Sequence, residues 1–180
     1  MLLKDYLPNI NKKFKNLNFS GLAFNSKEVK KNYIFIAIKG DRFDGNNYIN
    51  DAIKNGAKII ISSKFKDQIK NNIIYLKQKN PRQILSHLSS QIFKKKPQNL
   101  IAVTGTNGKT SIANFYYQIL KKNKKKVASF GTLGISGKKK IENTSNTTFD
   151  PITIGKNLNY LEKKKINNVI FCLLYTSDAA

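Results

Sequence analysis

Short continuous apolar runs alternate along the chain with apolar residues at helical spacing. The runs predict β-strands at residues 33–38, 57–61, 73–76, 100–103, 127–130 and 169–172. The helical spacings predict helices at residues 48–55, 81–93 and 109–122, and a fourth helix that begins at Asp150-Pro151. Strands and helices that alternate in this way indicate βαβ units and a parallel sheet, so the expected fold class is α/β.

A lysine-rich break separates two such α/β segments. Residues 94–96 are three lysines followed by Pro97, which is typical of a linker. The run just after it, Leu-Ile-Ala-Val at 100–103, is of the kind that parallel sheets bury on both faces. Because 180 residues suffice for one large domain or two small ones, we predict a division near residue 97.

Composition narrows the class of protein. No unbroken apolar run approaches the roughly 20 residues of a membrane-spanning helix, and the opening Met-Leu-Leu-Lys-Asp reaches a charge before a secretory signal develops. The single cysteine, Cys172, allows neither an internal disulfide nor a multi-cysteine zinc site, and is predicted to be a core residue. The lone histidine, His87, is predicted to be a partly buried helix residue. We expect a cytoplasmic protein with no membrane partner and no histidine-centred acid/base chemistry.

The formal net charge of +23 suggests a polyanion partner, but the kind of basic residue argues against a specific one. Of 33 basic residues, only Arg42 and Arg82 are arginines, the side chain best suited to reading base edges. We therefore expect no specific nucleic-acid partner; a non-specific polyanion affinity that falls steeply with salt is the alternative. Four lysine triplets are interpreted as solvated surface at helix ends or in a turn: residues 94–96, 124–126, 138–140 and 163–165.

The segment Thr104–Ser111, Thr-Gly-Thr-Asn-Gly-Lys-Thr-Ser, carries the strongest chemical signal and lies between an apolar strand and a helix. Its glycines free the backbone to turn amides toward phosphate oxygens, and the helix N-terminus adds its positive dipole end. Lys109 and Thr110 are the predicted catalytic residues, because the lysine would reach the terminal phosphates of ATP and the threonine hydroxyl would ligate Mg²⁺. The predicted ATP-binding residues are Gly105, Thr106, Asn107, Gly108, Lys109, Thr110 and Ser111.

The alternative for this segment is a tight hairpin turn at Asn107-Gly108. The strict pattern G-x-x-x-x-G-K-[ST] is not met, because Val103 stands where the first glycine belongs. A hairpin, however, requires a second strand directly afterwards. The apolar residues that follow recur at helical spacing instead: Ile112, Phe115, Tyr116 and Ile119.

The run Thr-Gly-Thr-Asn-Gly-Lys-Thr after an apolar strand resembles the ATP loop of the Mur ligases, cytoplasmic enzymes that build the peptide of bacterial cell-wall precursors. Folylpolyglutamate synthetases share this loop. Before it, Phe24–Val29 and Gly40–Gly45 resemble the Mur ligase pieces D-S-R-x-V and G-x-x-x-D-G. After it, Gly131–Gly134 and Asn146–Asp150 resemble G-T-[LV]-G and N-T-T-P-D. The pieces are similar to those of the family member that adds the third residue of the peptide.

The resemblance implies an amide-forming reaction. ATP, with Mg²⁺, phosphorylates the carboxylate of UDP-N-acetylmuramoyl-L-Ala-D-Glu, and the amine of the incoming amino acid, meso-diaminopimelate, attacks the acyl phosphate. The residues implied at the UDP end of the substrate are Phe24, Ser26, Asp41, Arg42 and Phe43, and those nearer its muramoyl-dipeptide part are Asn146, Thr147 and Thr148. For residues 144–148 the alternative is a polar loop that caps the helix at Asp150-Pro151.

By the same resemblance, residues 1–97 form a small UDP-substrate-binding domain and residues 98–172 a truncated P-loop ATPase domain, whereas residues 173–180 do not match the family. We expect a monomer that lacks ligase activity by itself and has an apolar edge where its second sheet is interrupted. The alternatives are a ligase that adds the D-Ala-D-Ala dipeptide, a folate-type glutamate ligase, and a lysine-rich polyanion-binding fragment without catalysis.

Overall fold

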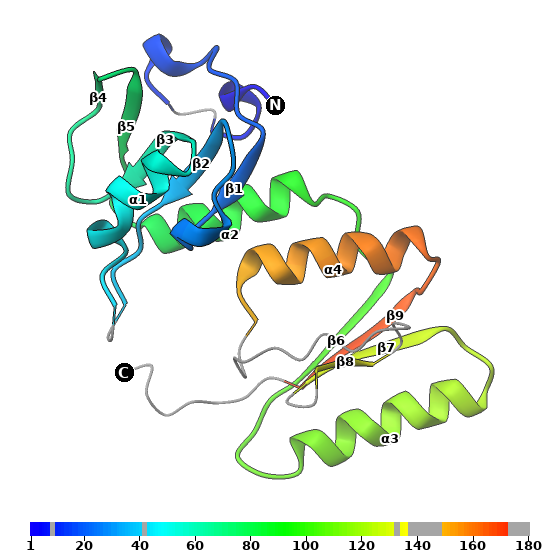
Figure 1. Ribbon diagram of the computed structural model, residues 1–180. Coiled ribbons are helices and arrows are strands. Elements are labelled where there is room, and N and C mark those ends of the chain that lie inside the picture. Colours follow the sequence, from blue (N-terminus) through cyan, green and yellow to red (C-terminus); the bar gives the residue numbers. More distant parts are fainter. Residues whose placement is uncertain (8–9, 41–42, 132–133, 137–148, 173–180) are drawn as a thin grey trace. The chain divides into compact units, whose positions relative to one another are not determined.

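The computed structural model describes residues 1–7, 10–40, 43–131, 134–136 and 149–172 (Figure 1). The chain divides into two compact units, Met1–Ile92, called unit 1, and Phe93–Ala180, called unit 2. Each unit is described by itself. Parallel strands joined through helices make up most of both, so the predicted α/β fold class is confirmed.

The sheet of unit 1 has five strands in the order β1-β2-β3-β5-β4. Strands β1, β2, β3 and β5 run parallel, and β4 is antiparallel to β5. The parallel strands end at one border of the sheet, called here the carboxyl edge. The strands are β1 Gly21–Ala23, β2 Tyr33–Ile36, β3 Ala57–Ser62, β4 Gln68–Lys70 and β5 Ile73–Lys77.

Helices complete unit 1, and their apolar faces form its core with β2 and β3. Ile49 and Ala52 of α1 are buried, as their spacing predicts. The second helix, α2, begins at Pro81, and the side chain of Asn80 accepts a hydrogen bond from the Gln83 amide at 3.1 Å. The helices are η1 Leu3–Asp5, η2 Lys12–Phe14, η3 Ser26–Glu28, η4 Gly45–Tyr48, α1 Ile49–Lys54 and α2 Pro81–Ile92, where η marks a 3₁₀-helix.

The prediction for His87 is correct in its helix and wrong in its burial. The side chain lies in α2 but is exposed, and its Nε2 lies 3.1 Å from the carbonyl oxygen of Tyr6. The neighbouring Leu85 and Leu88 are buried instead. The face of α2 toward the core is therefore narrow, and the imidazole falls just outside it.

The sheet of unit 2 has four strands in the order β6-β9-β7-β8. Strands β6, β9 and β7 run parallel, and β8 is antiparallel to β7. Two helices cover its faces. The elements are β6 Asn99–Val103, α3 Lys109–Lys122, β7 Val127–Gly131, β8 Gly134–Ser136, α4 Pro151–Lys163 and β9 Asn168–Cys172.

Strand β9 contributes side chains to two separate cores, because successive side chains of a strand point to opposite faces of the sheet. Val169 and Phe171 pack with Leu158 and Leu161 of α4, whereas Ile170 and the buried Cys172 pack with Ala113 of α3. The prediction that Cys172 is a core residue is confirmed. Helices α3 and α4 therefore lie on opposite faces of this sheet (Figure 1).

The prediction that residues 100–103 form a strand is confirmed by β6, but the prediction that this strand is buried on both faces is wrong. Leu100 and Ala102 are exposed; β6 lies at the border of the sheet and, among the described strands, pairs with β9 alone. Three apolar side chains of α3, called here the α3 stripe, are exposed as well: Ile112 by 55%, Phe115 by 64% and Ile119 by 59%. Strand β6 and helix α3 therefore expose apolar side chains to solvent.

The lysine triplets at residues 94–96, 124–126 and 163–165 are exposed and lie at or just after the ends of α2, α3 and α4, as predicted. The triplet at 138–140 lies outside the described residues. Among the helices of the described ranges, none combines the length and the apolar character needed to cross a bilayer.

Candidate nucleotide and substrate sites

Residues 104–108 connect the end of β6 to the first turn of α3, so the segment is a strand–loop–helix and the hairpin alternative is wrong. Gly105 has φ +143° and Gly108 has φ +75°, values that side-chain-bearing residues rarely adopt. All five loop residues are exposed. The loop is therefore open to solvent and bends in a way that the two glycines make possible.

The backbone amides of this loop, at residues 105–108, have no backbone acceptor in the part of the chain that the structure describes. The Nζ of Lys109 donates to the carbonyl oxygen of Gly105 and, at 3.1 Å, to that of Thr106. The ammonium group thus lies over the loop, and the positive end of the α3 dipole adds to it. Such an arrangement suits a chain of phosphates.

Thr110 lies in the first turn of α3, and its Oγ1 is 3.7 Å from the Sγ of Cys172 at the end of β9. Because Cys172 pairs in register with Val103, the carboxyl ends of β6 and β9 lie side by side next to this hydroxyl. Within the described residues, no group of three or more His, Cys, Asp or Glu side chains is arranged to hold a metal ion. The Thr110 hydroxyl is a group at this loop that could hold a Mg²⁺ ion.

Three predicted substrate-binding residues lie at the carboxyl edge of unit 1. Phe24, half-buried, and Ser26, buried, follow β1, and Phe43 lies in the loop after β2 with its side chain 70% exposed. Ligands of open α/β sheets bind at such an edge. Two further predicted residues, Asp41 and Arg42, lie outside the described residues.

The predicted dipeptide-binding residues Asn146, Thr147 and Thr148 lie outside the described residues, as does the loop that was the alternative cap of α4. The residue that does cap α4 is Asp150, whose Oδ1 accepts hydrogen bonds from the amides of Ile152 at 2.9 Å and Thr153 at 3.0 Å.

Four side chains form a hydrogen-bonded network that the sequence did not predict, called here the Asp44 network: Asp44, Asn46, Ser62 and Lys64. Asp44 Oδ1 accepts from the Asn46 amide at 2.9 Å and from Asn46 Nδ2 at 2.6 Å, and Lys64 Nζ donates to Asp44 Oδ2 at 2.8 Å. Ser62 Oγ donates to Asn46 Oδ1 at 2.6 Å and accepts from the Lys64 amide at 3.1 Å. The network joins the loop after β2 to the end of β3.

The Asp44 network leads us to predict how the stability of the fold depends on pH. The hydrogen bonds from Lys64 and then Asn46 hold the pKa of the Asp44 carboxyl well below its ordinary value of 3.8. Because the folded-state pKa is lowered, the network stabilises the fold above about pH 3.8 and loses this contribution as the pH falls further. We expect Lys64→Met to raise the pKa of Asp44 in a carboxyl-detected NMR titration, and Lys66→Met to leave it unchanged. Equal pKa values in both variants would contradict the ion pair.

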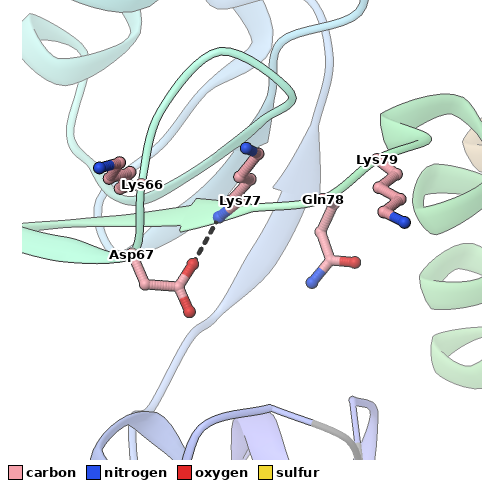
Figure 2. A pocket seen from close by; sticks show the side chains of 5 residues that line it. All are labelled: Lys66, Asp67, Lys77, Gln78 and Lys79. Atoms are coloured by element: carbon pink, nitrogen blue, oxygen red, sulfur yellow. Dashed lines mark hydrogen bonds between the residues drawn. The ribbon is translucent and has the colours of Figure 1, made fainter.

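A shallow, open hollow of about 470 Å³ lies further along the carboxyl edge (Figure 2). The backbone amide of Lys77 donates to Asp67 at 2.7 Å. Figure 2 shows the lysine side chains pointing away from one another, so the hollow does not gather their charges on one point. Its lining residues are Lys66, Asp67, Lys77, Gln78 and Lys79.

Two family models match the chain, and they meet near the division between the units. Residues 18–100 match the Mur ligase family catalytic domain and residues 103–173 match the Mur ligase middle domain. The chain therefore belongs to the Mur ligase family.

Two curated relatives of this chain are longer proteins with nearly the same name. The chain is 39% identical to the UDP-N-acetylmuramoyl-L-alanyl-D-glutamate--2,6-diaminopimelate ligase of Rickettsia prowazekii. The match extends over 167 residues and covers 91% of this chain and 34% of that protein. It is 36% identical to the ligase 2 of that name from Clostridium acetobutylicum, over 94% of this chain and 37% of that protein. The chain thus spans about a third of the length of the curated relatives it matches.

Solved structures agree on the fold. A ligase with the same 2,6-diaminopimelate name superposes with a TM-score of 0.76 at 23% identity, over 95% of this chain and 35% of that one. The MurF ligase of Thermotoga maritima, solved in complex with ADP, gives a TM-score of 0.56 at 26% identity, over 83% of this chain and 31% of that one.

Proposed function

We propose that this chain carries the UDP-substrate-binding and ATP-binding parts of a cytoplasmic ligase of peptidoglycan precursor synthesis. The ligase adds meso-diaminopimelate to UDP-N-acetylmuramoyl-L-Ala-D-Glu. The observation that carries the proposal is the open glycine loop of residues 104–108 in front of α3, in a chain whose relatives are named for this reaction. Unit 1 corresponds to the UDP-substrate-binding part and unit 2 to the ATP-binding part.

The reaction needs little covalent chemistry from the protein. A free carboxylate is a poor electrophile, whereas phosphate departs readily from an acyl phosphate, so the protein must position the groups and neutralise charge. Lys109 and the loop amides hold the phosphates of ATP, and the Thr110 hydroxyl ligates Mg²⁺. The ion supplies charge neutralisation on the transferred phosphoryl group. These roles are supported by the loop amides, which bond to no backbone acceptor among the described residues, and by the position of the Lys109 ammonium over the loop.

On the substrate side, Phe24, Ser26 and Phe43 contact the UDP end, together with Asp41 and Arg42. The support is their common position along the carboxyl edge, where parallel sheets receive ligands. The proposed residues at the muramoyl-dipeptide end are Asn146, Thr147 and Thr148.

The proposal predicts binding without turnover. Calorimetry should detect UDP-N-acetylmuramoyl-L-Ala-D-Glu and ADP with Mg²⁺ binding to the chain, with the GDP analogue of the sugar nucleotide as the control that does not bind. A coupled ADP-release assay with meso-diaminopimelate should stay at the no-enzyme level, because the chain spans about a third of its relatives. Equal affinity for the UDP and GDP sugars would contradict the proposed substrate, and turnover would contradict the expected inactivity.

A further inference from the structure

The dipeptide Asn-Gly occurs twice in this chain, at Asn55-Gly56 and at Asn107-Gly108. This dipeptide is especially prone to deamidation in water, because glycine has no side chain to shield its backbone nitrogen. In that reaction the nitrogen attacks the side-chain carbonyl carbon of the preceding asparagine. The reaction therefore requires that the side-chain amide and the following backbone amide are both free to approach each other.

The pair Asn55-Gly56 is held by hydrogen bonds on both of these groups. Asn55 Nδ2 donates to the carbonyl oxygen of Ser26 at 2.9 Å. The Gly56 amide donates to the carbonyl oxygen of Ile53, also at 2.9 Å. A Cβ on Gly56 would lie 2.9 Å from the Cα of Lys31, so the backbone is closely packed here. Asn55 is exposed to solvent, yet both reacting groups of this pair are bonded elsewhere.

The pair Asn107-Gly108 is the same dipeptide without these bonds. Both residues are exposed. Among the described residues, neither the Asn107 side chain nor the Gly108 amide forms a hydrogen bond. A Cβ placed on Gly108 would meet nothing within 4 Å, so the space beside it is open. The two groups that must meet for deamidation are therefore unbonded, and they lie in the glycine loop of residues 104–108.

We propose that Asn107 is a site of spontaneous deamidation, and that its conversion places a carboxylate inside the glycine loop and weakens nucleotide binding there. The Gly108 nitrogen bonds to the side-chain carbonyl carbon of Asn107, and the side-chain carbon–nitrogen bond breaks as ammonia leaves with the amide proton. Water then opens the cyclic imide at either carbonyl and leaves aspartate or isoaspartate. The overall change consumes water, releases ammonia and needs no other reactant.

The effect on binding rests on the proposed function, whereas the deamidation itself does not. A carboxylate at residue 107 brings a negative charge next to the phosphates of ATP, and like charges repel. Isoaspartate also adds a carbon to the main chain, which displaces the amides that follow it from the phosphates. Bound nucleotide should in turn slow the reaction, because a Gly108 amide that donates to a phosphate is not free to attack.

Mass spectrometry tests the modification on the whole chain. After incubation in mildly alkaline buffer, tandem mass spectrometry of a protease digest measures the aspartate and isoaspartate formed at each asparagine. Asn107 should convert at least about tenfold faster than Asn55 in the folded chain, because the groups of the latter must first break two hydrogen bonds. In guanidinium chloride the two should convert at similar rates. Equal rates in the folded chain would overturn the proposal.

The consequence for binding is tested with variants that carry the charge of the product. Asn107→Asp should raise the Kd for ADP with Mg²⁺ about tenfold or more. Asn55→Asp makes the same change of charge at the hydrogen-bonded pair, and as the matched control it should leave that Kd unchanged. Saturating ADP with Mg²⁺ should also slow the conversion of Asn107 several-fold in the parent chain. Equal affinity of the parent and Asn107→Asp for ADP would overturn the effect on binding.

Failure of this inference and failure of the proposed function give different results. If Asn107 converts selectively while ADP neither binds the parent chain nor slows the conversion, the modification site stands and the proposed nucleotide site is contradicted. If ADP binds the parent chain and Asn107 converts no faster than Asn55, the nucleotide site stands and the modification site is overturned.

Discussion

Lys109→Ala is expected to raise the Kd of the chain for ATP or ADP by at least a factor of ten, about 1.4 kcal/mol or more. The lysine is the side chain that lies over the glycine loop, with its Nζ bonded to the carbonyl oxygens of Gly105 and Thr106. Its removal leaves the loop amides and the helix dipole without the full positive charge that the terminal phosphates require. Calorimetric titration with the nucleotide and Mg²⁺ measures the change.

Two controls separate this site from a general attraction to charge. Lys122→Ala removes an exposed lysine from the other end of α3 and should leave nucleotide affinity unchanged. Binding of heparin at low salt should be nearly the same in both variants, because one of 33 basic residues changes in each. If Lys109→Ala and Lys122→Ala weaken ATP binding equally, the chain attracts nucleotides through its surface charge and the loop has no special role.

The second large effect concerns solubility. The α3 stripe exposes Ile112, Phe115 and Ile119 on one helix. Strand β6 of the same unit adds exposed apolar side chains and a border that no other described strand pairs with. Both features promote association. Replacing the three stripe residues together by glutamine should raise the soluble yield several-fold and delay aggregation on heating, as followed by light scattering.

The matched control changes an exposed polar helix face by the same number of residues. Arg82, Gln83 and Ser86 of α2 are exposed, and their joint replacement by alanine should leave the soluble yield close to that of the parent. Residues 1–97 alone, which lack the stripe and β6, should be more soluble than the whole chain. Equal aggregation of the stripe variant and the parent would show that another surface drives association.

Elements with strong local patterns could be predicted from the sequence. Apolar residues at helical spacing predict the helix at 109–122, and α3 begins at Lys109 as expected. Helix α4 begins at Pro151, with Asp150 as its N-cap, also as expected. The predicted helix at 48–55 is confirmed as α1, Ile49–Lys54, and the 3₁₀ turn η4, whose N-cap is Asp44, precedes it. Strands β1, β4 and β8, each three residues long, are too short to carry a pattern.

Burial depends on strand order, which no local pattern contains. Residues 100–103 and 169–172 are similar apolar runs, yet β9 lies in the middle of its sheet and β6 at the border. Leu100 of β6 is exposed, whereas Val169, its partner in register on β9, is buried against α4.

One candidate site could be predicted from local sequence and the other could not. The glycine loop was predictable because its residues are contiguous, whereas the Asp44 network joins residues 16 to 20 positions apart. Of its four residues, only Asp44 stood in a recognised piece, Gly40–Gly45, and the burial of Ser62 is visible only once β3 is in place.

The central claim is that backbone amides of residues 105–111 surround the phosphates of a nucleotide. An amide NMR titration of ¹⁵N-labelled chain with ADP and Mg²⁺ tests it most directly. The account predicts saturable shifts concentrated on the amides of Gly105 to Ser111, which are lost in Lys109→Ala. Shifts spread over the lysine-rich helix ends, with the amides of that loop unmoved, would contradict it.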